Sequence, residues 1–174
     1  VVHKGKTIFV ADTSVHEYPT SEQMSEIAIS AARVVRLFGF DPKVAFVSHS
    51  TFGQPLTSRT KHIKNAVEIL KEKNVDFEFD GDMQPDVALN KDYKDLYPFS
   101  KIVGNANILI MPGQHSAAIS YKMMKELGDT KVIGPLLIGL GLPIEIAPLR
   151  TSTSELINLA SIAAYSADVI DYEK

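Results

Sequence analysis

The amino-terminal part of the chain pairs a short apolar run with a longer segment of helical periodicity. Residues 7–11 (TIFVA) are mostly apolar and β-branched, which predicts a buried strand. From Met24 to Phe38, apolar residues recur at the spacing of one helix face, and Gly39 follows. Thr20 or Ser21 can cap this helix. Gln23, three positions after Thr20, completes the pattern of a capping box.

The same order of elements recurs along the chain. Residues 44–48 (VAFVS), 77–79 (FEF) and 107–111 (NILIM) predict three further strands, each ending at polar or glycine-containing sequence. Residues 58–73 and 117–127 show helical spacing. Strands therefore alternate with helices.

The remaining segments are less regular. Residues 144–147 predict another strand, and residues 153–167 predict a final helix with leucine, isoleucine and alanine on one face. Residues 84–104 are polar with scattered aromatic side chains, and we expect a short helix and loop there, or an excursion over a cleft.

This alternation predicts an α/β fold: three α/β/α layers around a mostly parallel sheet. Ligands of such folds usually bind beyond the carboxyl ends of the strands. The loops at Asp12, Ser48 and Pro112 are therefore where candidate chemistry is expected.

Composition narrows the class of protein. The 174 residues are 45% apolar and 22% charged, which suits one globular domain, or one domain with a short extension. A net charge of -3 without a basic stripe argues against a nucleic-acid partner. The absence of cysteine excludes disulfides, thiolate nucleophiles and cysteine-ligated zinc, and favours a cytoplasmic location.

No membrane segment or signal peptide is expected. The longest apolar stretch, residues 136–146, is too short and too rich in glycine and proline to cross a bilayer. The first residues lack the charged and apolar regions of a signal peptide. They also lack methionine, which is consistent with a piece of a longer polypeptide.

The loop after the second strand is the first candidate binding element. Ser48, Ser50, Thr51 and Gly53 offer hydroxyl groups and flexible backbone, which could hold a phosphate at the amino end of the next helix. A polar turn whose hydroxyl groups satisfy local backbone would have the same composition. The loop lacks the Gly-Lys-Ser/Thr ending of a Walker motif. Spacing alone leaves both interpretations open.

Other polar residues have weaker patterns. Asp12 at a strand end could act as a base or ligand, or simply as a loop residue. Arg59 and Arg150 carry guanidinium groups that suit phosphate oxygens. The five histidines have no metal-ligand spacing, so each is interpreted as a loop or surface residue and no metal site is expected. For the glycine-rich residues 134–143 we favour tight backbone packing over a dinucleotide loop.

An ordered series of short motifs resembles the signatures of phosphate acetyltransferases and butyryltransferases. They are residues 11–13 (ADT), 19–23 (PTSEQ), 42–45 (PKVA), 48–50 (SHS), 80–86 (DGDMQPD), 106–107 (AN), 119–122 (ISYK) and 134–143. The resemblance implies the isocitrate-dehydrogenase-like, phosphotransacetylase fold of two domains, in which an acyl group moves between CoA and phosphate in the interdomain cleft. The chain would be its carboxy-terminal half: residues 1–150 the second domain, and residues 151–174 a closing helix that packs on the missing first domain.

One stretch departs from the active family. Where the family has Asn-Asp-Leu-Ser-Arg-Gly, residues 145–150 read EIAPLR, with Pro148 at the serine position and Leu149 at the arginine position. Glu155 stands at the position of the family's acid. Losing such preorganised groups typically costs about a hundredfold or more in rate per group. The substitutions argue against efficient acyl transfer.

Further details are similar to the carboxy-terminal domain of hybrid NADP-dependent malic enzymes. They are residues 48–53 (SHSTFG), Met111-Pro112 and residues 134–139 (GPLLIG). In that family NADP, a divalent metal and malate chemistry belong to the amino-terminal part, and the appended domain is associated with oligomerisation and inhibition by acetyl-CoA.

The resemblance predicts that the chain is a regulatory domain that binds acetyl-CoA as an effector. Its cleft would be floored by residues 48–53, 112–116 and 148–152, with binding by Ser48, Ser50, Thr51, Gly53, Arg150 and Ser152. No residue is given a catalytic role in this reading.

Two alternatives stay open. An active acyltransferase would use CoA and acetyl phosphate as substrates, with Arg150 replacing the lost arginine and Glu155 as base. A purely architectural dimerisation domain would bind no CoA. In each case the apolar face of residues 153–167, without its first domain, favours a homo-oligomer.

Overall fold

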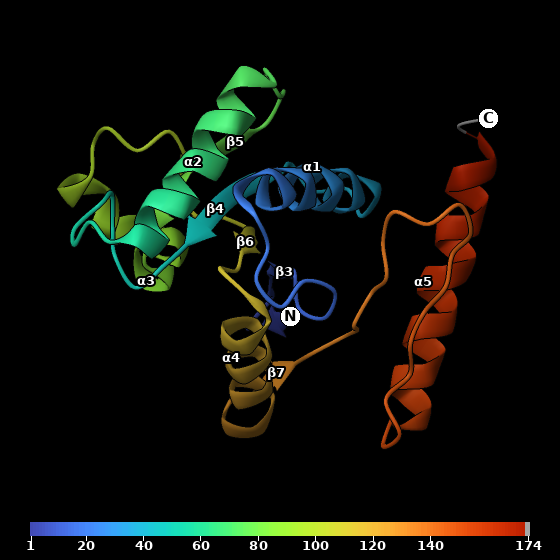
Figure 1. The fold of residues 1–174 in the computed structure, drawn as a ribbon. Coiled ribbons are helices and arrows are strands. Elements are labelled where there is room, and N and C mark those ends of the chain that lie inside the picture. The colour runs from blue at the N-terminus through green and yellow to red at the C-terminus, as the bar shows by residue number, and fades with distance from the viewer. Residues whose placement is uncertain (173–174) are drawn as a thin grey trace.

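The centre of the molecule is a four-stranded parallel sheet in the order β3-β6-β4-β5 (Figure 1). The coordinates are a computed structural model that describes residues 1–172. The strands are β3 (Phe9–Ala11), β4 (Lys43–Val47), β5 (Glu78–Met83) and β6 (Ile108–Ile110). The predicted α/β class with a mostly parallel sheet is confirmed.

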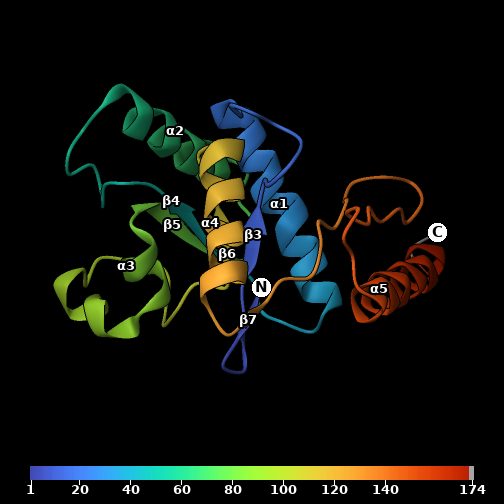
Figure 2. The same cartoon turned by 90° about the horizontal axis from the view of Figure 1, so that it is seen from below.

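Helices cover both faces of this sheet (Figure 2). One face packs against α1 (Ser21–Leu37) and α2 (Ser58–Glu72). The other face packs against α3 (Pro85–Leu89) and α4 (Gln114–Leu127), and a short 3-10 helix, η1 (Lys91–Leu96), follows α3. The predicted short helix and loop within residues 84–104 are thus present.

Strand β4 shows why the sheet is buried on both sides. Val44 and Phe46 enter the core beneath α1 and α2, whereas Ala45 and Val47 enter the core beneath α3 and α4. All four side chains are at most 2% exposed. Because successive side chains of a strand point to opposite faces, a continuous apolar run is what a doubly covered strand requires.

Local capping chemistry fixes the start of α1. The Gln23 amide N–H donates to Thr20 Oγ1 at 3.2 Å, and the Thr20 amide N–H donates to Gln23 Oε1 at 2.8 Å. These reciprocal hydrogen bonds satisfy backbone groups that the first helical turn leaves free. The predicted capping box is confirmed.

Two predictions about the chain's later half are wrong. Residues 144–147 form no strand, and Glu145 makes only a single antiparallel bridge to Leu136. Tight packing of the glycine-rich segment holds at Gly134, where an added Cβ would lie 3.0 Å from a backbone nitrogen, but Gly139 and Gly141 face open space. Residues 134–138 are half-buried and residues 139–142 are exposed, so apolar content alone did not define the structure of this loop.

A second, small sheet was not predicted. It joins β1 (Val2–His3), β2 (Lys6–Thr7) and β7 (Thr130–Lys131) in the antiparallel order β2-β1-β7. Two-residue strands carry no periodic signal. Their pairing brings together residues separated by most of the chain, which local sequence does not reveal.

The final helix, α5 (Thr153–Tyr172), lies beside the central layers and not within them (Figure 1). Leu159 is buried, but Leu156 and Ile157 are exposed. Tyr165 stacks on Phe38 with ring centroids 6.4 Å apart, and its hydroxyl donates to the Leu37 carbonyl at 2.9 Å. Within residues 1–172, no helix combines the length and apolar character needed to span a membrane.

The contrast between two glycines gives a test of this packing. An added Cβ at Gly81 would lie 2.7 Å from Phe46 Cβ and 2.8 Å from the Phe46 carbonyl oxygen, whereas Gly141 has nothing within 4 Å. We expect Gly81→Ala to lower the free energy of unfolding by ~1–3 kcal/mol or more, because backbone must move. Gly141→Ala should be nearly neutral. Urea unfolding of both variants measures this, and equal effects would contradict the packing at β4 and β5.

Candidate functional site

A pocket of about 760 Å³ opens beyond the carboxyl ends of β4 and β6. Helices α1, α2 and α4 all begin beside it, so their amino-terminal N–H groups lie near this edge of the sheet. Its polar lining includes Ser48, His49, Arg59, His62, His115 and Ser116.

The charges around this pocket suit an anion. Within the described part of the chain, no aspartate or glutamate lines it, and Arg59 is an exposed guanidinium without an ion pair. A guanidinium fork beside hydroxyl groups and helix amino ends binds phosphate or carboxylate oxygens well.

His62 adds a structural role at the same pocket. Its Nε2 lies 2.8 Å from the Pro19 carbonyl, and its Nδ1 lies 3.0 Å from Ser21 Oγ, which donates to the His62 carbonyl at 2.9 Å. These contacts tie the amino-terminal end of α1 to α2.

The loop after β4 is held by a buried carboxylate. Asp82 is 1% exposed; it accepts hydrogen bonds from Ser50 Oγ and, at 3.0 Å, from the Gly53 amide. Thr51 Oγ1 accepts from the Gln84 amide at 3.2 Å. Ser50, Thr51 and Gly53 thus satisfy groups inside the protein, as the turn interpretation predicts. Only Ser48 of the four candidates lines the pocket.

Arg150 and Glu155 lie elsewhere. Together with Lys125 they line a hollow of about 110 Å³ beside the start of α5, and this hollow shares no lining residue with the larger pocket. Arg150 makes no ion pair within the described residues. The residues expected at one binding cleft therefore occupy two places in this chain.

The carboxylate of Glu155 makes hydrogen bonds within the protein. It accepts from the Ser152 amide at 2.7 Å, the Ser152 hydroxyl at 2.8 Å and Lys125 Nζ at 3.0 Å. These hydrogen bonds, with the Ser152 amide foremost, lower the pKa of Glu155 to about 2. Ser152 caps α5 through its hydroxyl, which also accepts from the Glu155 amide. A carboxylate held this firmly ionised is a weak base for a thiol.

Residues 148 and 149, in the turn before α5, carry no polar side chain. Pro148 lacks a side-chain donor, and its carbonyl accepts from the Thr151 amide at 3.0 Å in a turn. The Leu149 side chain is fully exposed. The turn therefore presents an apolar side chain to solvent where an acyl-transfer site would need a donor.

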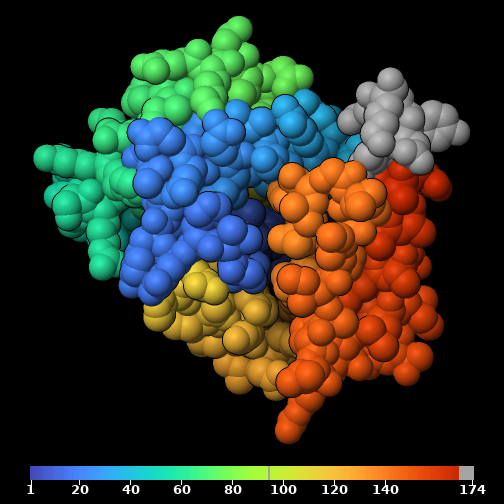
Figure 3. Space-filling view, turned by 45° about the vertical axis from the view of Figure 1, so that its right-hand side comes forward, coloured from blue at the N-terminus to red at the C-terminus, as the bar shows by residue number. Residues whose placement is uncertain are grey.

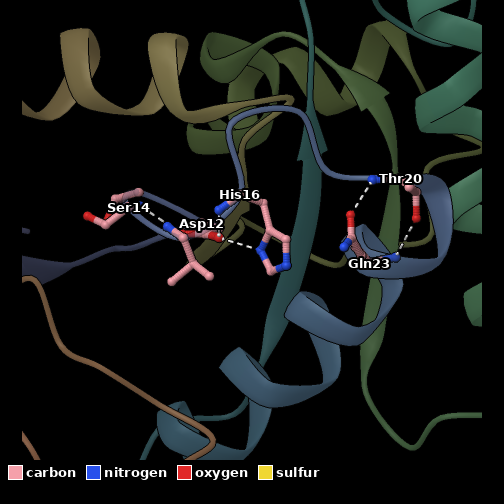
Figure 4. Close-up of polar contacts among 7 residues, drawn as sticks. Asp12, Ser14, His16, Thr20 and Gln23 are labelled. Carbon is pink, nitrogen blue, oxygen red and sulfur yellow. Dashed lines mark hydrogen bonds and ion pairs between the residues drawn. The ribbon is translucent and has the colours of Figure 1, made fainter.

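Asp12 is an orienting group at the end of β3 (Figure 4). Its carboxylate accepts from the amides of Ser14, Val15 and His16, and from His16 Nδ1 at 2.8 Å. Asp12 therefore shapes its own loop and fixes the imidazole of His16.

Residues 48–49, 112–113 and 115–116 line the pocket as the sequence predicts, but the sequence assigned its histidines no role there. His49, His62 and His115 were interpreted as loop or surface residues, but all three line the pocket. All three lie near the end of an element: His49 is two residues after β4, His62 is the fifth residue of α2, and His115 is the second residue of α4. In a parallel sheet these positions converge at one edge.

Fold and site together define a phosphotransacetylase-like α/β domain. The family described as phosphate acetyl/butaryl transferase matches residues 1–164, and the chain belongs to this family. The EutD phosphotransacetylase from Staphylococcus aureus superposes with a TM-score of 0.88 at 28% identity, over 95% of this chain and 52% of that one.

Within the family, the chain is similar in sequence to two kinds of protein. The chain is 49% identical over 164 residues to an NADP-dependent malic enzyme of Rhizobium meliloti, covering 94% of this chain and 22% of that protein. It is 35% identical over 162 residues to a phosphate acetyltransferase of Clostridium acetobutylicum, covering 92% and 49%. The chain thus spans less than a quarter of the malic enzyme and about half of the acetyltransferase.

The carboxylate of Glu155 allows a direct test of the α5 cap. Its folded pKa of about 2 lies below its ordinary value of 4.5, so the cap contributes stability above pH 4.5 that is lost as the pH falls toward 2. We expect Ser152→Ala to raise the pKa of Glu155 part of the way toward its ordinary value, because the hydroxyl donor is lost while the amide of residue 152 and Lys125 Nζ remain. An NMR titration of the carboxyl carbon measures both values. Ser161→Ala is the control, since the Ser161 hydroxyl donates to the Ile157 carbonyl, further along the helix. An unchanged pKa in Ser152→Ala would refute the assignment.

Proposed function

We propose that this chain is the acetyl-CoA-sensing, phosphotransacetylase-like part of an NADP-dependent malic enzyme. In this proposal malate oxidation, NADP and the divalent metal belong to a preceding part of the polypeptide. The similarity to proteins named as malic enzymes, at 49% identity, supports this choice of parent. The protein would act in the cytoplasm as a homo-oligomer, without a nucleic-acid or membrane partner.

The pocket beyond β4 and β6 supports binding of a CoA thioester. CoA carries several phosphate groups, and Arg59, Ser48 and His49 offer donors to phosphate oxygens in a pocket whose described lining holds no carboxylate. Glu17 lies at its border, 3.7 Å from His115 Nε2. Its 760 Å³ lies within the usual range for a small-molecule site. The bracing by Asp82 keeps the loop fixed before the ligand arrives, which lowers the ordering cost of binding.

The stretch before α5 supports sensing over catalysis, and it is the observation that carries the proposal. Pro148 and Leu149 supply neither a hydroxyl nor a cation, and Glu155 is held ionised by its own helix cap and by Lys125. A pocket that binds the thioester without stabilising its transition state can still shift a conformational equilibrium, provided its affinity differs between two states.

Helix α5 supports the proposed domain division, with residues 1–150 as the second domain and residues 151–174 as a closing segment. Residues 173–174 lie outside the described part of the chain. The exposed Leu156 and Ile157 on α5 are suited to pack on a preceding domain or on a second copy.

One observation supports a second candidate function, acyl transfer. Arg150, Lys125 and Glu155 line one hollow, and Arg150 is unpaired within the described residues. Two cations beside a carboxylate are groups that phosphoryl and acyl chemistry can use. An active phosphate acetyl- or butyryltransferase would place its reaction there.

Arg59 gives the sharpest test of acetyl-CoA sensing. In the complete natural chain, acetyl-CoA should lower the rate of NADPH formation from malate. Arg59→Ala should raise the acetyl-CoA concentration needed for this effect about 10- to 100-fold, because a charge-assisted contact to phosphate is lost. Calorimetric titration with acetyl-CoA measures the affinity directly.

Arg36→Ala is the matched control, because Arg36 pairs with Asp76 on the surface and lines none of these pockets. It should leave both the affinity and the inhibition unchanged. Absence of acetyl-CoA binding in calorimetry would favour the architectural alternative and end the sensing proposal.

Acyl transfer is tested separately. The complete chain should form acetyl-CoA from acetyl phosphate and CoA at no more than a trace rate, and Arg150→Ala should leave that trace unchanged. Turnover at an enzyme's rate that falls about a hundredfold or more in Arg150→Ala would instead establish the active alternative.

A further inference from the structure

A second pocket, of about 300 Å³, lies between the loop after β3, the first half of α1 and the segment at residues 135–138. In Figure 3 a hollow is visible between the blue amino-terminal residues and the orange carboxy-terminal segment. This pocket shares no lining residue with the 760 Å³ pocket. Its walls are largely apolar, formed by Val15, Ile27, Leu136, Leu137, Ile138 and Ile146.

One titratable pair faces this apolar space. Asp12 and His16 both line the pocket, and Asp12 Oδ2 lies 2.8 Å from His16 Nδ1. Figure 4 shows the imidazole between its loop and α1, with the second ring nitrogen on the side away from Asp12. Within the described part of the chain, that nitrogen, Nε2, has no hydrogen-bond partner.

The Asp12 carboxylate determines which ring nitrogen of His16 carries the hydrogen in the neutral ring. Burial would raise the pKa of Asp12, but hydrogen bonds from the Ser14, Val15 and His16 amides and from the His16 ring together lower it. An ionised carboxylate only accepts hydrogen bonds, so His16 Nδ1 carries the hydrogen. In the neutral ring, Nε2 is then an acceptor with a fixed direction.

The remaining charges exclude an anionic ligand. Among the described residues no lysine or arginine lines the pocket, whereas Glu26 does, and Glu26 is itself paired with Lys73. Gln23 is used in the α1 cap. His16 therefore faces a largely apolar space whose described lining offers no cation to a carboxylate or phosphate.

We propose that this pocket binds a small, uncharged molecule with a short alkyl chain and one hydroxyl or thiol group, which donates its hydrogen to His16 Nε2. The alkyl chain would lie against Leu137, Ile138 and Ile146. The site is independent of the acetyl-CoA pocket proposed above.

The size of the pocket sets the length of such a molecule. About 300 Å³ is at the lower end of small-molecule sites. An adjoining hollow of about 130 Å³ shares Val10, Ala11, Pro135, Leu136 and Ile138 with it, so additional carbon atoms can extend in that direction.

Isomeric probes test the hydrogen bond without changing the size of the ligand. n-Butanol and methyl propyl ether have the same formula, but only the alcohol can donate. Ligand-observed saturation-transfer NMR on the complete natural chain should show n-butanol binding about three- to tenfold more tightly than the ether, the usual range for one neutral hydrogen bond. n-Butanethiol, titrated in parallel, distinguishes a thiol site from a hydroxyl site. Butyrate should bind more weakly than n-butanol.

His16→Phe should abolish the preference for alcohol over ether while retaining binding of both, because the apolar walls remain. His3→Phe is the control, since His3 lies outside this pocket and should leave the preference intact. Equal binding of n-butanol and the ether to the unaltered protein would overturn the proposal without any variant. So would butyrate binding as tightly as n-butanol, a preference that survives in His16→Phe, or no binding of any probe.

Discussion

The carboxylate of Asp82 is the contact on which the ligand-facing edge of this protein depends. It lies near the end of β5, almost completely buried, and accepts hydrogen bonds from groups that belong to the loop after β4. A carboxylate buried without such donors would cost several kcal/mol, so the loop must take the conformation that supplies them. The backbone oxygen of Asp82 accepts from the Phe52 amide at 2.6 Å, which adds a further constraint. Phe52 in turn packs with Tyr97 and Phe99, and so ties the loop to the segment after η1.

This constraint explains why some polar residues of the loop hold its structure while others face the pocket, a difference that composition does not reveal. The hydroxyl groups of Ser50 and Thr51 look available for a ligand, but the protein uses them to hold the loop together. The groups that face the pocket come from the ends of elements instead: Ser48 and His49 after β4, and Arg59 early in α2. The residues that line the pocket thus share no sequence motif. The recognisable motif, in the loop after β4, serves to hold that loop in place.

Much of the fold could be predicted because its signals are local. The run at residues 44–48 identifies a doubly buried strand, and the Thr20 and Gln23 pair marks the first turn of α1, since both depend on neighbours in sequence. Strand β5 was predicted too short, because Asp80 and Asp82 are polar. Their place in the sheet depends on distant partners: Asp80 accepts from the Lys101 amide at 2.7 Å, and Asp82 from Ser50. The site was predicted in part for the same reason, because Ser48 follows a recognisable strand, whereas the separation of Arg150 from it is set by the path of residues 132–152.

The aromatic contacts of α5 link the edge of the molecule to its interior. Tyr165 stacks on Phe38, and Phe38 lies 5.9 Å from the ring of Phe9, which begins β3. Strand β3 ends at the Asp12 loop, so three rings and one strand form a continuous line from the outer helix to the His16 imidazole. The opposite end of α5 is held by Lys125 and Glu155. Helix α5 is therefore joined to the central layers at two separate points, and the contact through Tyr165 leads by way of Phe38, Phe9 and β3 to the loop that orients His16.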